Sequence, residues 1–319
     1  MTQAERNPFE FSDTNKRYHT YNYYLNKRFG KKCAKITLDL GFSCPNIDGT
    51  RGVGGCIYCA GGSASLNCKE AKDVFEQFEQ GVQAVRKKWD VDSFIAYMQA
   101  YTNTHTSPSV LKETLERVQA LPNLVMLDIA TRADCLENEK LEIINEVSKK
   151  IPVTLELGLQ SSSDKTAKII NRCHTYAEFE DAVQRIRKIA PSVKIGVHII
   201  NGLPQENYDD MIKTAQDVAK IHPDLVKIHL LHVIEGTPLA KMYKNGQYTP
   251  ISRQDYVKTV CDQLELLPAD IVIERVTGDG IGSDLLAPEW SRKKVTVIND
   301  IDKELYRRSS FQGSKFKKK

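Results

Sequence analysis

The sequence has no long apolar run. None of its 319 residues belongs to a stretch approaching the ~18 consecutive apolar residues that a membrane-spanning helix needs. The first eleven residues also lack the apolar core and small-residue cleavage site of a secretory signal. These absences exclude a membrane channel. They lead us to expect a cytoplasmic protein without membrane contact, whose eight cysteines are thiols or metal ligands rather than disulfides.

Internal repeats, low-complexity linkers and a second C-x2-C pair are also missing. The composition is that of a globular protein, with 41% hydrophobic and 27% charged residues. The charge is unevenly distributed. Residues 1–38 carry eight Lys or Arg against three Asp or Glu, and residues 290–319 carry ten against three. Two basic ends around an acidic body favour a polyanionic partner.

Apolar, β-branched runs alternate with amphipathic stretches, which is the pattern of repeated βα units. The sequence predicts strands over 34–40, 94–99, 124–130, 153–159, 193–200 and 225–232. It predicts helices over 69–89, 109–121, 137–149, 176–189, 208–221 and 252–267, then a short strand over 271–274 and a Gly-rich loop over 278–282. The fold class is α/β, a partial parallel (β/α)6 barrel. We expect it over 34–240, with a basic and aromatic extension over 1–33 and a C-terminal extension with a basic tail over 241–319.

Three cysteines follow the first predicted strand. Cys44, Cys56 and Cys59 have the spacing C-x11-C-x2-C, and four glycines between the first two let the loop curl. Four soft ligands would close a zinc or iron–sulfur site, whereas three leave one metal position open for a substrate or cofactor. The ligands of parallel βα folds bind beyond the carboxyl ends of the strands, which is where this loop lies.

Two other interpretations of these thiols stay open. Cys68, nine residues after Cys59, could complete a four-cysteine structural zinc site, and the cysteines could be inert core residues. Position argues against both, because a structural zinc has no need to lie directly after the first strand of a barrel.

Short motifs in the expected order follow the strands. They are CIYC at 56–59, ATRAD at 130–134, LGLQS at 157–161 with INRCH at 170–174, NGLP at 201–204 and EGTP at 235–238. Together they resemble the radical S-adenosylmethionine (radical SAM) superfamily over roughly residues 33–240. They are similar to motifs of the Elongator catalytic subunit, the methylthiotransferases and the oxygen-independent coproporphyrinogen enzyme. The whole chain further resembles a small bacterial family near the Elongator subunit, the MnmL type of tRNA wobble-uridine modification enzyme.

The resemblance implies that Cys44, Cys56 and Cys59 hold a [4Fe–4S] cluster whose fourth iron binds S-adenosylmethionine. It implies an enzyme that converts 5-carboxymethylaminomethyluridine of tRNA to 5-aminomethyluridine through hydrogen abstraction by a 5′-deoxyadenosyl radical. The implied partners are tRNA, at its anticodon region, and an electron donor of flavodoxin or ferredoxin type. The catalytic acid or base stays unknown, with Cys135, Cys173 and Tyr101 as candidates for a relay.

The resemblance also implies six contacts to the cofactor, from Tyr58, Thr102, Gln160, Arg172, His198 and Gly202. The second-strand motif of the family, Gly-Gly-Thr or Gly-Gly-Glu, is replaced here by Ala100-Tyr101-Thr102, which leaves Thr102 as the candidate contact to the methionine amino group. Because Ala130 stands where relatives carry a ribose-binding acid, the ribose contacts fall to Gln160, Arg172 and His198.

Each of the three ribose candidates also has a structural interpretation. Gln160 could cap a helix, and Arg172 could pair with a surface acid such as Glu178. His198 could be a core histidine on an otherwise apolar strand.

The basic ends favour RNA because cations neutralise phosphates and neighbouring aromatic rings stack on unpaired bases. Alternatively, Tyr18, Tyr21 and Leu25 recur at helical spacing and could be the core face of a helix, and residues 315–319 could be a solvated end. The candidate RNA contacts are Lys27, Arg28, Lys31, Lys32, Arg292, Lys293, Lys294, Arg307, Arg308, Lys317 and Lys318.

Three functional classes therefore remain. The leading class is a radical enzyme that modifies tRNA. The second is a radical enzyme acting on a small molecule, as in porphyrin biosynthesis, and the third is a zinc-stabilised nucleic-acid-binding protein without catalysis.

Overall fold

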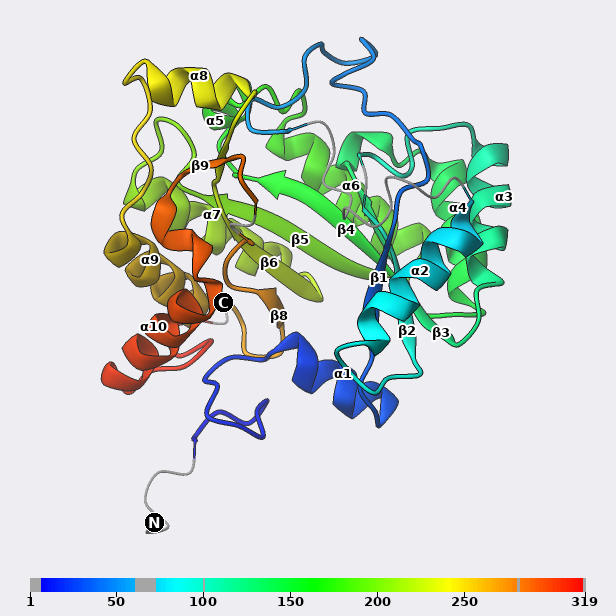
Figure 1. Cartoon of the computed structure of the whole chain (residues 1–319), viewed down its shortest axis with the longest axis horizontal. Coiled ribbons are helices and arrows are strands. Elements are labelled where there is room, and N and C mark those ends of the chain that lie inside the picture. The colour runs from blue at the N-terminus through cyan, green and yellow to red at the C-terminus, as the bar shows by residue number, and fades with distance from the viewer. Residues whose placement is uncertain (1–6, 61–72, 100, 280–281, 318–319) are drawn as a thin grey trace. The chain divides into compact units, whose positions relative to one another are not determined.

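The computed structural model describes residues 7–60, 73–99, 101–279 and 282–317. The chain forms two compact units. The first unit comprises Met1–Tyr24, Gln160–Ile170 and Val197–Lys319, and the second comprises Leu25–Leu159 and Asn171–Gly196. Figure 1 shows the helices and strands of each unit.

The second unit is built from βα repeats. Its strands are β1 (Ala34–Leu38), β2 (Phe94–Met98), β3 (Leu124–Thr131) and β4 (Val153–Gln160), with β5 (Lys194–Asn201) beginning in it. Strands β1 to β4 pair in parallel with their neighbours. Its helices are α2 (Val74–Arg86), α3 (Pro108–Gln119), α4 (Asn138–Ser148) and α6 (Tyr176–Ile189). Helices α3 and α4 lie side by side, and α2 packs on β1 (Figure 1).

The first unit holds most of β5 and the strands β6 (Leu225–Leu230) and β8 (Val272–Arg275), with β6 and β8 paired in parallel. Helix α9 (Arg253–Leu266) packs between α7 (Tyr208–Ile221) and α10 (Lys294–Arg307). The short helices α5 (Asp164–Ile169) and α8 (Pro238–Lys244) and the antiparallel pair β7 (Val233–Ile234) and β9 (Leu285–Ala287) complete it. Helix α1 (Tyr21–Phe29) follows the N-terminal segment of this unit.

The strand order of the main sheet is β1-β2-β3-β4-β5-β6-β8. This order, with parallel pairing, confirms the predicted α/β class and partial parallel barrel. The predicted barrel has six strands, whereas the main sheet has seven. The short strand predicted over 271–274 is β8, which extends the sheet beyond β6.

Local sequence explains where the helices begin. Thr175 accepts a hydrogen bond from the Glu178 backbone N–H at 3.2 Å, and the Glu178 carboxylate accepts one from the Thr175 N–H at 2.7 Å, which starts α6. Asn207 and Asp210 form the same reciprocal box at the start of α7. All five residues of β2 are buried, as expected for a parallel strand covered on both faces.

No helix among the described residues combines the length and the apolarity that a membrane crossing requires.

Candidate functional site

The loop after β1 carries the three predicted cysteine ligands. The Cys44 carbonyl accepts hydrogen bonds from the backbone N–H groups of Ile47 and Asp48 at 2.8 and 3.1 Å, and Cys59 N–H donates to the Cys56 carbonyl at 2.9 Å. The loop reverses at Gly54 and Gly55, whose φ values of +77° and +73° suit glycine. Two tight turns thus shape the cysteine loop, defined here as residues 44–59.

The three thiols influence one another electrostatically. Burial, aided by negative charge on Cys59 and Cys44 and opposed by Arg132, raises the pKa of the Cys56 thiol to about 11. Three neighbouring thiolates therefore repel one another in the absence of a cation. A metal centre relieves that repulsion, and three soft sulfur donors with one open position are the donor set of a [4Fe–4S] cluster that binds a further ligand. The residues fit the cluster.

Contacts within the second unit anchor the cysteine loop. The Asn171 side-chain amide donates to the carbonyls of Val53 at 3.0 Å and Gly55 at 2.7 Å. Arg51 pairs with Glu178 at 2.9 Å. The loop is consequently held to the residues just before α6 and to the first turn of that helix, a relation that the cysteine spacing did not reveal.

A second contact joins the loop to the chain after β2. The Asp48 carboxylate lies 2.7 Å from Nε2 of His105, and hydrogen bonds from Thr50 hold the pKa of Asp48 well below its ordinary value. The Thr102 backbone N–H donates to the Ser43 carbonyl at 3.2 Å, which places buried Thr102 directly beside Cys44. This is consistent with Thr102 as a cofactor contact, although Ala100 lies outside the described residues.

Two tyrosines also lie close to the cysteine thiols. Burial of the Tyr58 hydroxyl raises its pKa, and the Cys56 thiol beside it acts in the same direction. Burial also raises the pKa of Tyr101, with contributions from Cys59 and Cys44. Both phenols therefore stay protonated at neutral pH and can donate hydrogen bonds beside the cluster ligands.

Arg172 is 1% exposed. Its Nε and Nη2 donate to the His174 carbonyl at 3.1 and 2.9 Å, and Nη1 donates to the Leu159 carbonyl. The suggested surface partner, Glu178, pairs with Arg51. Arg172 thus joins the end of β4 to the segment that anchors the cysteine loop, and its role as a ribose contact stays a prediction.

Gln160 and His198 belong to the first unit. Gln160 ends β4 with a left-handed φ of +66°, and no helix begins at it, since Ser163 caps α5. His198 on β5 is half-buried, with its ring centroid 5.1 Å from that of His229 on β6. The His198 ring is therefore packed beside a second imidazole, and both its cofactor contact and its interpretation as a core histidine stay predictions.

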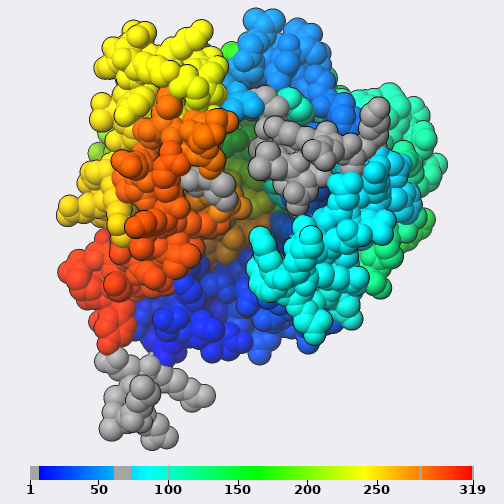
Figure 2. All heavy atoms as spheres, in the orientation of Figure 1, coloured from blue at the N-terminus to red at the C-terminus, as the bar shows by residue number. Residues whose placement is uncertain are grey.

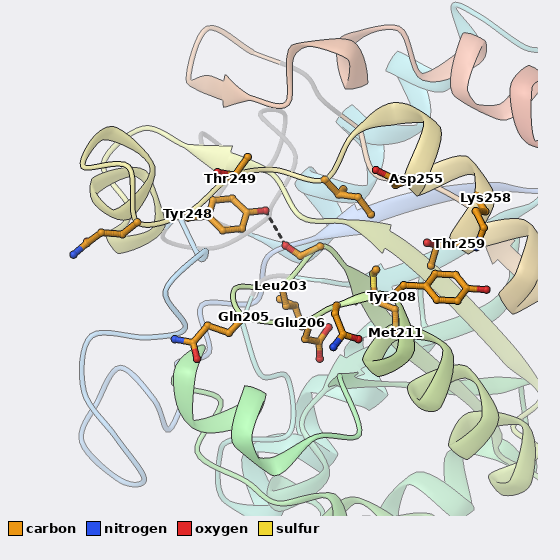
Figure 3. Close-up of a pocket in the computed structure, with 14 residues that line it drawn as sticks. Leu203, Gln205, Glu206, Tyr208, Met211, Tyr248, Thr249, Asp255, Lys258 and Thr259 are labelled. Atoms are coloured by element: carbon orange, nitrogen blue, oxygen red, sulfur yellow. Dashed lines mark hydrogen bonds between the residues drawn. The ribbon is translucent and has the colours of Figure 1, made fainter.

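Gly202 lines a cavity of about 420 Å³ inside the first unit. Its φ is +86°, and an added Cβ would lie 3.1 Å from Ile251 Cγ2. Its carbonyl accepts a hydrogen bond from the Tyr248 hydroxyl at 2.8 Å (Figure 3). Backbone conformation and packing thus both require glycine here, whether or not it also contacts a cofactor.

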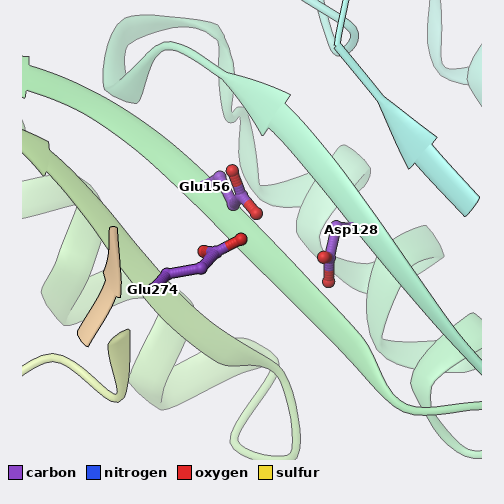
Figure 4. Close-up of side chains that lie close together, drawn as sticks. All are labelled: Asp128, Glu156 and Glu274. Carbon is purple, nitrogen blue, oxygen red and sulfur yellow. The ribbon is translucent and has the colours of Figure 1, made fainter. Parts of the chain in front are cut away.

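Buried charges on the strands are neutralised locally. Asp128 on β3 and Glu156 on β4 project from adjacent strands (Figure 4). Lys35 Nζ lies 2.7 Å from Asp128 and 3.0 Å from Glu156. In the first unit, Lys227 pairs with Glu274 at 3.1 Å. These lysines balance the carboxylates, so the acids alone do not define a metal site.

Four predicted RNA contacts lie on or just after α1. Lys27, Arg28, Lys31 and Lys32 are all exposed. Lys31 lies 3.2 Å from Asp92, and the Lys32 ammonium lies 4.3 Å from the Trp89 ring centroid. The blue segment that carries them is at the surface of the face shown in Figure 2. Tyr18 and Leu25 are buried but Tyr21 is not, so the core-face alternative is correct for two of its three residues.

The C-terminal candidates are engaged within the first unit. Arg308 pairs with Asp262 and Glu304, each at 2.7 Å, and Arg307 pairs with Glu304 at 2.8 Å. The N-terminal segment contacts α10 through Lys16 and Asp302. Much of the positive charge near α10 is therefore balanced by acids.

The remaining basic candidates differ in their surroundings. Lys294 pairs with Asp279 at 2.6 Å, and Arg292 donates to the carbonyls of Gly282 and Leu285 at 2.9 and 2.6 Å. Lys293 and Lys317 are exposed. Lys318 and Cys68 lie outside the described residues.

Comparisons with known proteins identify the family of the chain. The family model of the radical SAM superfamily matches residues 47–218, and that of the radical SAM C-terminal domain matches 223–307. YtqA of Bacillus subtilis (strain 168) is 42% identical over 315 residues, covering 98% of this chain and 97% of that protein. The tRNA uridine(34) acetyltransferase of Methanocaldococcus infernus is 29% identical over 159 residues, 49% of this chain and 29% of that protein.

The structure of M. infernus Elp3 with an N-terminal deletion has the same fold, with a TM-score of 0.66 over 88% of this chain and 64% of that chain at 16% identity. The family match displaces the zinc-protein alternative. Its cofactors are a [4Fe–4S] cluster and S-adenosylmethionine. Cys44, Cys56 and Cys59 as the sulfur donors to that cluster stay a prediction. The chain belongs to the radical S-adenosylmethionine superfamily.

Proposed function

We propose that the protein modifies the wobble uridine of tRNA, converting 5-carboxymethylaminomethyluridine to 5-aminomethyluridine. The observation that carries the proposal is the similarity of half the chain to an enzyme named for uridine 34 of tRNA. The exposed cations of residues 27–32 provide a surface for phosphates. The class of radical enzyme is established by the family, whereas the RNA substrate is the proposed part.

The residues of the site bind the cofactors and shield them from solvent. They do not exchange protons with the substrate. Cys44, Cys56 and Cys59 hold the cluster, and Thr102 lies beside the first of them. When bound, the cluster and S-adenosylmethionine supply a 5′-deoxyadenosyl radical that removes a hydrogen atom from the glycine-derived carbon of the modified base. Burial raises the pKa of Cys135 to about 12, so this thiol stays protonated and is a poor base.

The reaction balances with S-adenosylmethionine as the oxidant. The amine is oxidised by two electrons to an imine, and water then cleaves the nitrogen–carbon bond. The products are 5-aminomethyluridine, a two-carbon aldehyde acid, methionine and 5′-deoxyadenosine.

The test uses anaerobically purified enzyme, a reductant and an anticodon stem-loop that carries 5-carboxymethylaminomethyluridine. We expect equal amounts of 5-aminomethyluridine, aldehyde acid and 5′-deoxyadenosine by mass spectrometry. The control is Cys56→Ala, which removes one cluster ligand. Aldehyde acid formed equally well without S-adenosylmethionine, or an unchanged RNA in a reaction that still yields 5′-deoxyadenosine, would refute the proposal.

A further inference from the structure

Asn46 lies inside the cysteine loop, two residues after Cys44, and is 0% exposed. Its side-chain Nδ2 lies 3.6 Å from Cys56 Sγ and also donates a hydrogen bond to the backbone carbonyl of Asn171. Its own backbone carbonyl accepts from the Gly55 N–H at 2.9 Å. The Asn46 side-chain amide therefore lies between the predicted cluster ligand Cys56 and the carbonyl of Asn171, which belongs to the segment that anchors the loop.

The orientation of the Asn46 amide follows from its neighbours. The Asn171 carbonyl can only accept a hydrogen bond, so the NH2 group rather than the oxygen of Asn46 must face it. The Asn46 Oδ1 atom is buried and has no hydrogen-bond partner among the described residues. The amide thus directs its N–H donors at the Asn171 carbonyl and at the Cys56 sulfur. No described residue donates a hydrogen bond that would favour the flipped orientation of the amide.

Metal binding strengthens the contact with the sulfur. In the thiol form, Cys56 Sγ lies 3.7 Å from the Asn171 carbonyl, to which its S–H can donate. A metal-bound thiolate has lost that proton and can only accept. The Asn46 N–H then remains as a donor to a sulfur that carries more negative charge, which makes the hydrogen bond charge-assisted.

We propose that Asn46 raises the reduction potential of the [4Fe–4S] cluster through a hydrogen bond to the sulfur of Cys56. A donor at a ligand sulfur stabilises the more electron-rich reduced cluster, and hydrogen bonds to sulfur are among the factors that set such potentials. Asn171 is a positioning residue, because its carbonyl holds the Asn46 amide and its side chain holds the Val53 and Gly55 carbonyls. The inference depends on the cluster and not on the identity of the substrate.

The test is a redox titration of the reconstituted protein followed by electron paramagnetic resonance. Asn46→Leu removes the donor and keeps a similar volume, and we expect its midpoint potential to be more negative than that of the parent at equal iron content. Asn171→Gly is the matched control. Glycine tolerates the φ of +55° and keeps the accepting carbonyl, but it removes two anchors of the loop.

The two variants separate an effect on the reduction potential of the cluster from an effect on how firmly the cluster is held. For Asn171→Gly we expect an almost unchanged potential and faster loss of iron to a chelator. An unchanged midpoint in Asn46→Leu, or an equal shift in both variants, would overturn the proposal.

A measurement on the unaltered protein covers the case in which Asn46→Leu fails to hold the cluster. We label the asparagine side-chain amides with 15N and record pulsed spectra of the reduced cluster. A 15N hyperfine coupling is expected in the parent and in Asn171→Gly. The absence of this coupling from the parent would contradict the hydrogen bond to Cys56.

Discussion

Gly52 illustrates how tightly a single residue of the cysteine loop is packed. A Cβ atom at this position would lie 2.8 Å from Cys173 Sγ. The Cys173 thiol is held in place by a hydrogen bond to Asn171 Oδ1 at 3.2 Å. The loop is therefore fitted against the segment 171–173 with no room for a methyl group.

We expect Gly52→Ala to destabilise this arrangement by about 1–3 kcal/mol, as overpacking does in well-packed interiors. The measurement is the iron and sulfide content of the protein after anaerobic reconstitution, which should fall. Adding Cys173→Ala to the same chain removes the obstructing sulfur and should restore the cluster. Failure of the double variant to recover would show that Gly52 is needed for another reason.

A second residue-scale property is the protonation of His174. Burial, together with the positive charges of Arg172 and Arg132, lowers its pKa to about 2. Its Nδ1 is 3.9 Å from Asp134, but this is not an ion pair because the imidazole is neutral and Asp134 accepts hydrogen bonds from Arg132 at 2.8 and 2.9 Å.

This depressed pKa predicts a stability that falls in acid. Below the ordinary imidazole pKa of about 6.5 the unfolded chain binds a proton that the folded chain does not take up until about pH 2. The free energy of unfolding should then fall by up to about 1.4 kcal/mol per pH unit below about 6.5. Urea unfolding between pH 5 and 7.5 should show a shallower pH dependence for His174→Leu. A difference between the two proteins that is constant with pH would contradict this account.

At the scale of elements, the start of α7 offers a test of local sequence. The Asn207 side chain accepts from the Asp210 N–H at 3.1 Å, and the Asp210 carboxylate accepts from the Asn207 N–H at 2.9 Å. We expect Asn207→Ala to lower the free energy of unfolding by about 1 kcal/mol, whereas Asn207→Asp keeps an acceptor and should cost much less. Chemical denaturation compares the three proteins, and equal losses for both substitutions would show that the cap is unimportant.

The same element shows what the sequence could predict. Helix α7 was expected over 208–221 and occupies Tyr208–Ile221, because its cap and its apolar period agree. Helix α10 was not predicted, although Val297, Ile301 and Leu305 recur every four residues and are buried. Its many charges and its lack of a capping side chain concealed this period.

The site was predictable where its signal is local. The cysteine spacing and the CIYC motif point to the loop as the candidate site, because those residues lie close together in the sequence. The partnership of Asn46 with Asn171 joins positions 125 residues apart. No periodicity or spacing encodes such a pair, since it depends on how strands and loops meet after folding.

At the scale of the whole molecule, the proposed RNA substrate predicts a salt-dependent interaction. Replacing Lys27, Arg28, Lys31 and Lys32 together by Gln should weaken tRNA binding. If each contacts one phosphate of a single-stranded region, the slope of log K against log salt should become shallower by about 3. The measurement is tRNA binding over a range of salt concentrations.

The matched control replaces four exposed lysines of other elements, which should leave that slope almost unchanged. These are Lys112, Lys165, Lys168 and Lys241. Equal effects of the two sets would indicate attraction by net charge alone, and no effect of either would argue against these surfaces as RNA contacts.

The anchoring of the cysteine loop also has a consequence for biosynthesis. All three predicted sulfur ligands leave the ribosome more than one hundred residues before Asn171, whose side chain and carbonyl secure the loop. A nascent chain at that stage offers thiols on an untethered segment. Iron delivery should therefore follow translation of the later strands, and a truncated chain that ends before this asparagine should acquire little iron despite containing every ligand.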